Sequence, residues 1–162
     1  ALGSVTNADF AREVFTGVYD SDMGLWQPNA SKALELRSNL NNKKLKLMFN
    51  VNAEFASPLG DRKTPEKAES AVFSSLADAI CVSGVITGKA VNIDELKETK
   101  KKVKDVPVFA NTGVNINNID EIFKIADGCV IGSSLKYDGD TWNNIDQQRV
   151  KELMDKVNKI RG

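Results

Sequence analysis

The sequence predicts an α/β fold in which crossover helices cover a parallel sheet, and two observations lead to this prediction. Five short apolar runs, each compatible with a buried strand, occur along the 162 residues. Segments with helical periodicity separate these runs. Strand, loop and helix repeated in this way are typical of parallel sheets, whose strands need long connections. No linker or low-complexity segment divides the chain, so a single α/β domain over residues 1–162 is predicted.

The apolar runs predict the strands, because each is short and most are rich in β-branched or aromatic residues. Several of them end in glycine, serine or asparagine, which are typical of turns. The predicted strands are "DFAREVF" (9–15), "LKLMFNV" (45–51), "DAICVS" (78–83), "VPVFAN" (106–111) and "GCVIGS" (128–133).

The helical segments carry capping residues at their starts. Asn92, with Glu95 three residues later, forms a capping-box pattern. Asp146 is a predicted N-cap, and Thr64 precedes Pro65 at the first helical position. The predicted helices are residues 29–40, 64–76, 92–103, 117–126 and 146–160.

The second predicted strand indicates which kind of parallel sheet this is. In "KLKLMFNVNAEF" (44–55), Leu45, Leu47, Phe49 and Val51 share one face, and the other face becomes polar towards the carboxyl end. Central strands of doubly wound sheets are apolar on both faces. Barrel strands turn one face to the helices and the other inward, towards a polar mouth. Two architectures fit the chain, a flavodoxin-like five-stranded doubly wound sheet and the C-terminal half of an eight-stranded β/α barrel, and this strand favours the barrel.

Composition narrows the classes of function. Lys+Arg and Asp+Glu both number 22, so there is no basic excess to bind nucleic acid or an anionic membrane. No apolar run approaches the ~20 residues that span a bilayer. The chain contains no histidine, which excludes Ser-His-Asp and Cys-His catalysis and histidine-ligated metals within it. Neither a metal site nor another cofactor is predicted.

The two cysteines, Cys81 and Cys129, lie inside apolar runs. Buried free thiols in a reducing compartment are expected, which favours a cytoplasmic protein. The two cysteines belong to the third and fifth predicted strands. With one strand between them they would be ~10 Å apart. That is too far for a disulfide, which needs Cα atoms within about 7 Å.

Small and amide residues follow the strands, at the end where ligands bind in parallel α/β folds. "NTGVN" follows the fourth run and "GSSLK" ends the fifth, and neighbouring turns of this kind can surround a phosphate with backbone N–H groups. The candidate phosphate-binding residues are Asn111, Gly113, Gly132, Ser133 and Ser134. The candidate catalytic residues, which would face the rest of the ligand, are Arg12, Asn50, Asn52 and Glu54.

Three segments and their order resemble the BtpA/SgcQ family. They are "FAREVFTGVYDSDMGLW", "LADAICVSGVITGKAVNIDELKETKK" and "VPVFANTGVNINNIDEIFKIADGCVIGSSLKYDGDTWNNID". The resemblance covers essentially the whole chain and is most specific over residues 126–143. It implies a β/α barrel of which this chain would supply strands four to eight, without the N-terminal part.

The resemblance indicates the fold but does not identify a reaction. Together with the predicted phosphate site, it leads us to expect a protein that binds a small phosphorylated ligand, a sugar phosphate or nucleotide. An aldolase-, isomerase- or hydrolase-like enzyme of unknown reaction would fit this site. The alternatives are a non-enzymatic assembly or stability factor and a self-contained flavodoxin-like domain. A half-barrel exposes two sheet edges, so self-association into a homo-oligomer is also expected.

Overall fold

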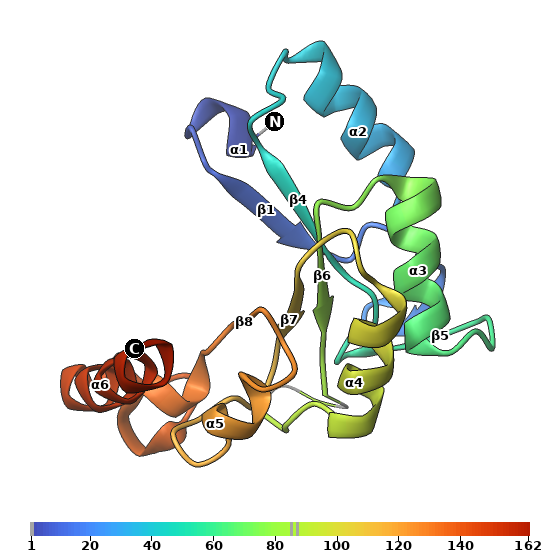
Figure 1. Ribbon diagram of the computed structural model, residues 1–162. Helices are drawn as coiled ribbons and strands as arrows, with labels where there is room; N and C mark the ends of the chain where they lie inside the picture. The colour runs from blue at the N-terminus through green and yellow to red at the C-terminus, as the bar shows by residue number, and fades with distance from the viewer. Residues whose placement is uncertain (1, 85, 87) are drawn as a thin grey trace.

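The computed structural model describes residues 2–84, 86 and 88–162, and its centre is a five-stranded parallel sheet (Figure 1). The strands occur where the apolar runs predict them, although each is shorter than its run. They are β1 (Phe10–Glu13), β4 (Lys46–Asn50), β6 (Ala79–Val82), β7 (Val108–Ala110) and β8 (Gly128–Cys129).

The strands are adjacent in the sheet in the order in which they occur along the chain, β1-β4-β6-β7-β8, and every pair is parallel. A flavodoxin-like sheet would instead have the order 2-1-3-4-5. The flavodoxin-like alternative is therefore wrong, and the α/β half-barrel is confirmed as the fold class. The sheet does not close on itself within the described residues, because β1 and β8 are its two edges.

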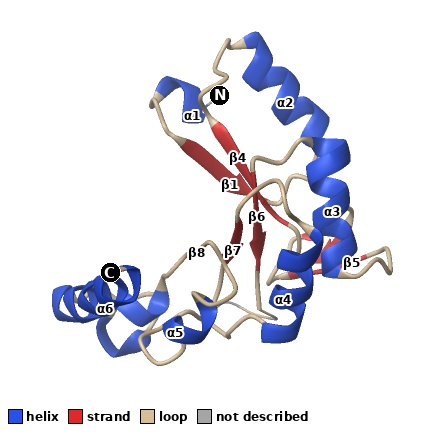
Figure 2. Cartoon of the chain, viewed as in Figure 1, coloured by secondary structure: helices blue, strands red, loops and turns tan. Residues whose placement is uncertain are grey.

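Helices connect the strands and cover one face of the sheet (Figure 2). They comprise α1 (Leu2–Val5), α2 (Ala30–Asn39), α3 (Thr64–Ser75), α4 (Ile93–Lys102), α5 (Ile119–Ile122) and α6 (Gln147–Arg161), with two 3₁₀ turns, η1 (Ser133–Leu135) and η2 (Tyr137–Gly139).

The two faces of the sheet are buried to different degrees. On the outer face, Phe49, Ile80 and Val108 are fully buried and pack with side chains from α3 to α6 in one large core. Burial of each such side chain stabilises the fold by roughly 1.5–3 kcal/mol. The inner face carries a separate, small cluster of Met48, Ala79 and Cys81, to which no helix contributes. The alternation of residues 44–55 thus predicted correctly which face the helices cover.

The sheet is strongly curved, as one side-chain contact shows. Arg12 on β1 donates a hydrogen bond through Nη1 to Asn111 Oδ1, just beyond β7, at 2.8 Å. Strands β4 and β6 lie between them, and in a flat sheet three strand spacings would separate the two backbones by ~14 Å. Curvature towards the inner face brings them together, as in a β/α barrel.

A second sheet, which the sequence analysis did not predict, lies beside the parallel one. It is antiparallel, with the order β3-β2-β5, and consists of β2 (Tyr19–Ser21), β3 (Gly24–Trp26) and β5 (Ala56–Pro58). Residues 57–65 contain two prolines and a glycine, a composition typical of loops, although Ser57 and Pro58 belong to β5. Trp26 joins the strands by packing against Tyr19 and Phe55, with ring centroids 5.6 and 5.1 Å apart. The contact between Trp26 and Phe55 links segments far apart in the chain, so no local pattern indicates it.

The helix caps agree with the sequence except at α3. Asn92 accepts from Glu95 N at 3.0 Å, and Asp146 accepts from Gln148 N at 2.9 Å. Helix α3 begins at Thr64 as predicted, but Thr64 rather than Pro65 is its first helical position, so Lys63 is its N-cap, and Glu66 accepts from Lys63 N.

Both cysteines are free thiols, and β7 lies between their strands, as predicted. Among the described residues, no helix has the length and apolar character required to cross a membrane.

Candidate functional site

Polar side chains at the carboxyl ends of four strands form one hydrogen-bond network. Arg12 donates to Asn111 Oδ1, and Asn111 Nδ2 donates to Ser83 Oγ at 2.8 Å. Ser83 is also held by Asn52, whose Oδ1 accepts from Ser83 N at 2.8 Å and whose Nδ2 donates to Ser83 O at 2.7 Å. The network therefore connects β1, β4, β6 and β7 across the inner face.

The turn after β7 is fixed by its contacts with Gly84, Lys89 and Ala90. Thr112 Oγ1 donates to Lys89 O at 2.9 Å and accepts from Gly84 N. Gly113 has a φ of 64°, and a Cβ at this position would overlap the backbone of Lys89 and Ala90. Glycine is thus required here by conformation and by packing.

The turn after β8 differs from the turn after β7, because packing does not require its glycine. A Cβ on Gly132 would meet no atom within 4 Å, so packing does not demand glycine at this position. Within the described part of the chain, no group accepts a hydrogen bond from the backbone N–H groups of Gly132, Ser133 or Ser134. Three donors and an open approach are thus present at this turn.

Ser134 joins the two turns, since its Oγ donates to Val114 O at 2.8 Å. Ser133 Oγ lies 2.6 Å from Thr141 Oγ1 in the following loop. The two turns that the sequence predicted to be neighbours are therefore side by side.

Both turns line one pocket of about 630 Å³ at the carboxyl ends of the strands. The cations Arg12, Lys89 and Arg149 also line it, and Glu54 is the carboxylate among its described lining residues. Arg149 lies in the first turn of α6, 3.5 Å from Asp146 and within 3.5 Å of Ser134 O. The positive charge of this pocket suits an anionic ligand.

Seven of the nine predicted site residues line this pocket, and two do not. Those that line it are Arg12, Glu54, Asn111, Gly113, Gly132, Ser133 and Ser134. Asn52 has both amide atoms bonded to Ser83. Asn50 is buried, and its Oδ1 has no hydrogen-bond partner among the described residues.

Sequence reasoning missed Lys89, Thr141 and Arg149, which complete the pocket. Each lies in a loop or a helix start rather than at the end of an apolar run, so the strand pattern carries no signal for it. The Asp146 cap was the available signal for Arg149, because it places that residue in the first turn of the helix that follows the last strand.

The buried thiol of Cys81, on the inner face of the sheet, is a poor nucleophile. Burial raises the pKa of Cys81 to about 12, and the charge of Arg12 lowers it only in part. Cys81 therefore stays protonated at neutral pH, and thiolate chemistry is disfavoured there.

Comparison with known proteins agrees with this architecture. The sequence model of the BtpA family matches residues 1–159. The chain is 41% identical over 160 residues to the putative sgc region protein SgcQ of Escherichia coli, covering 99% of this chain and 60% of that protein. It is 32% identical over 156 residues to the photosystem I biogenesis protein BtpA of Synechocystis, covering 96% and 54%.

Among solved structures, wild-type GGGPS from Thermoplasma volcanium matches with a TM-score of 0.59 at 16% sequence identity. The match covers 94% of this chain and 64% of that one, and it supports a TIM-type barrel fold. The chain thus spans about three fifths of the length of the curated relatives it matches.

Proposed function

The chain belongs to the BtpA family, and we propose that it binds a small phosphorylated molecule, a sugar phosphate or nucleotide, at the carboxyl ends of its parallel strands. The observation that carries this proposal is the Gly132–Ser134 turn. Its backbone N–H groups have no acceptor among the described residues, and Gly132 leaves them open to approach. A phosphate supplies several acceptor oxygens, and N–H groups of successive residues in a turn are a common way to bind it.

The charges around the turn support the same proposal. Arg149 lies beside Ser134 and Lys89 lines the same pocket, so the pocket offers two cations to a phosphate. Charge-assisted hydrogen bonds to phosphate are about twice as strong as neutral ones. In barrels of the TIM type, the loops after the last two strands often hold a phosphate, which is the position of these turns if β8 is the eighth strand.

The rest of the ligand would lie towards β1 and β4. Arg12 and Asn111 offer a cation and an amide there, and Glu54 offers a carboxylate for general acid–base work. An aldolase, isomerase or hydrolase would use such a site.

The five parallel strands are proposed to be strands four to eight of the barrel, within a single domain. The edges of β1 and β8 and the partly exposed inner face then need cover, and Phe10, 56% exposed, is one of the residues that need it. In this chain alone, that cover would come from self-association into a homo-oligomer.

A second candidate rests on one relative. Because a protein 32% identical to this chain is named a photosystem I biogenesis protein, a non-enzymatic role in the assembly or stability of another protein is the alternative. Turnover of a bound ligand would distinguish an enzyme from such a factor.

The test is calorimetric titration of the chain with ribose 5-phosphate and with inorganic phosphate, with ribose as the uncharged control. Both anions should bind and ribose should not. Gly132→Val should reduce the binding at least tenfold, and Gly132→Ala should reduce it less, because the added side chain enters open space in the pocket. Both variants should unfold in urea at the same midpoint as the parent chain, within the effect of a surface substitution.

The proposal fails if neither anion binds, or if folded Gly132→Val and Gly132→Ala bind them as well as the parent does. A turn without a ligand would then explain the small residues.

A further inference from the structure

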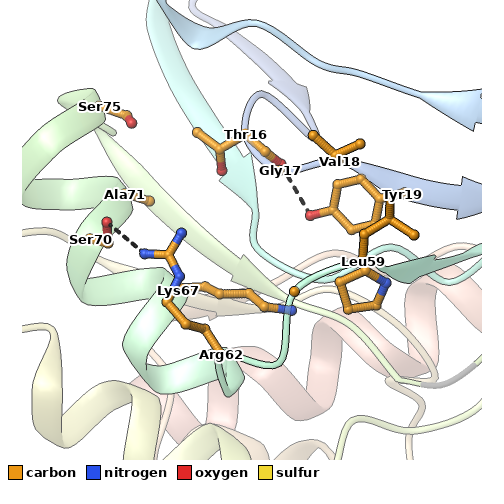
Figure 3. A pocket seen from close by; sticks show the side chains of 12 residues that line it. Thr16, Gly17, Val18, Tyr19, Leu59, Arg62, Lys67, Ser70, Ala71 and Ser75 are labelled. Carbon is orange, nitrogen blue, oxygen red and sulfur yellow. Dashed lines mark hydrogen bonds between the residues drawn. The ribbon is translucent and has the colours of Figure 1, made fainter.

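A second pocket, of about 560 Å³, lies away from the carboxyl-end site, between α3 and the segments that lead into β2 and away from β5 (Figure 3). Its volume is within the range of small-molecule sites, about 300–1,000 Å³. Residues 16–19 form one wall, residues 58–62 another, and the face of α3 that carries Lys67 and Ser70 forms the third.

Two cations define the chemistry of this pocket. Figure 3 shows Arg62 and Lys67 entering it from the same side, with the Arg62 guanidinium reaching Ser70 and Lys67 extending towards Leu59. Arg62 Nη1 donates to Ser70 Oγ at 3.3 Å. The described residues that line the pocket include no Asp or Glu, and among the described residues neither cation has a carboxylate oxygen within 4.0 Å.

The two charges influence one another. The pKa of Lys67 is lowered, chiefly by burial; the charge of Glu95 raises it, and the charge of Arg62 lowers it to a smaller extent. Two like charges held at one pocket repel, and an anion between them would replace this repulsion with two attractive interactions.

The opposite wall is apolar and exposed. Leu59 is 64% exposed and Val18 is 41% exposed, and Pro58 lies next to Leu59 in the same wall. Tyr19 is buried at the base of this wall, and its hydroxyl donates to Thr16 O at 3.1 Å. An apolar wall opposite two cations suits a molecule with a compact anionic head and an apolar body.

We propose that the pocket formed by Arg62, Lys67, Ser70, Val18 and Leu59 is a second binding site, for an organic anion whose carboxylate or phosphate head lies between the two cations. The apolar body of this ligand lies against Val18 and Leu59. This site is independent of the proposed function, because it shares no lining residue with the carboxyl-end pocket.

The experiment is a titration of the ¹⁵N-labelled chain with phenyl phosphate, and separately with benzoate, followed by backbone amide NMR. Amides of Gly17, Gly60, Lys67 and Ser70 report this pocket, and those of Gly132 to Ser134 report the carboxyl-end site. The first group should shift with both probes, and their relative affinities tell whether the head is better matched by phosphate or carboxylate. Benzyl alcohol, which has the apolar body without the charge, should bind at least tenfold more weakly.

Substitutions make the test specific to the two cations. Lys67→Met and Arg62→Met should each lower the affinity for the tighter-binding probe about tenfold, as expected for the loss of a charge-assisted hydrogen bond of about 1.4 kcal/mol. Lys63→Met is the matched control, because it removes the same charge from an exposed neighbour that does not line the pocket, and it should change the affinity less than twofold.

Three results would overturn the proposal: no shift of the first group of amides with either probe, equal binding of benzyl alcohol, or an equal loss in the Lys63→Met control. Since the two groups of amides are read separately, failure here leaves the carboxyl-end site to be judged on its own shifts.

Discussion

The polar groups at the amino-terminal ends of the parallel strands are paired with one another, whereas some of those at the carboxyl-terminal ends have no partner in the described part of the chain. At the amino-terminal end, Asp78 precedes β6 and accepts hydrogen bonds from Leu47 N at 2.9 Å, Arg37 at 2.6 Å and Lys46 at 3.3 Å. Asp127 precedes β8 in the same way and accepts from Val108 N at 2.7 Å and Lys100 at 2.6 Å. Each carboxylate thus binds the backbone of the neighbouring strand and at least one cation.

At the carboxyl-terminal end, by contrast, polar groups converge on a pocket and some of them lack partners. The N–H groups of Gly132, Ser133 and Ser134 have no acceptor among the described residues. Pairing at one end stabilises the sheet, whereas unpaired groups at the other end are available to a ligand. This division is the usual one in β/α barrels.

The largest expected effect comes from Gly113→Val, which shows that a residue of the carboxyl end can be structural. The left-handed φ of 64° alone costs about 1–3 kcal/mol for a non-glycine residue. Overlap with the backbone of Ala90 adds to this, so we expect a loss of stability above 3 kcal/mol or failure to fold, measured by urea unfolding. A stable Gly113→Val chain would show that the backbone of Lys89 and Ala90 adapts easily.

Asp78→Ala should have the next largest effect, about 2–3 kcal/mol of stability, because it leaves Leu47 N and Arg37 without their acceptor. Phosphate binding by the folded fraction should be unchanged. Asp94→Ala is the matched control, because Asp94 is exposed and its ion pair with Lys97, at 3.8 Å, is a weak surface pair. This substitution should cost less than about 0.5 kcal/mol of stability. Equal losses for the two variants would contradict the structural role of Asp78.

Acid should weaken the amino-terminal end specifically. Burial, the largest single influence, raises the pKa of both Asp78 and Asp127, but the hydrogen bonds from backbone and cations together outweigh it, so both values lie below normal. The unfolded chain, with a pKa of about 3.9, then takes up these protons more readily than the folded one. Their stabilisation is complete above about pH 5 and is lost as the pH falls through the lowered values.

Urea unfolding of the parent chain and of the double variant Asp78→Asn/Asp127→Asn, at pH 6 and at pH 3.5, measures this contribution. The variant should lose less stability between the two values than the parent does. An equal loss would assign the acid sensitivity to other carboxylates.

The smallest expected effect is that of Ser134→Ala. Ser134 contributes both to the stability of the fold and to the proposed phosphate site. Loss of the hydrogen bond to Val114 O should cost about 1 kcal/mol of stability. Binding of ribose 5-phosphate should weaken about fivefold, or about 1 kcal/mol, because the two turns are no longer held together. Ser74→Ala, at an exposed position of α3 that lines neither pocket, serves as the control and should change neither quantity.

The sequence by itself determined the elements of the parallel sheet and their faces. Periodicity located the five strands and the covering helices, and the alternation from Leu45 to Glu54 identified the face that the helices bury. The caps at Asn92 and Asp146 could be read because a cap and its N–H partner lie within three residues of each other. These features depend on neighbours along the chain, so a local pattern suffices.

Only the tertiary structure decided which polar residues meet. Arg12 and Asn111 are 99 positions apart, and their hydrogen bond depends on the curvature of the whole sheet. Gly113 and Gly132 look alike in the sequence, yet one is held against the Ala90 backbone and the other faces open space. The roles of Asn52 and Arg149 likewise depend on Ser83 and Ser134, which other segments bring to them. Long-range packing sets these contacts, and no pattern within a few residues encodes it.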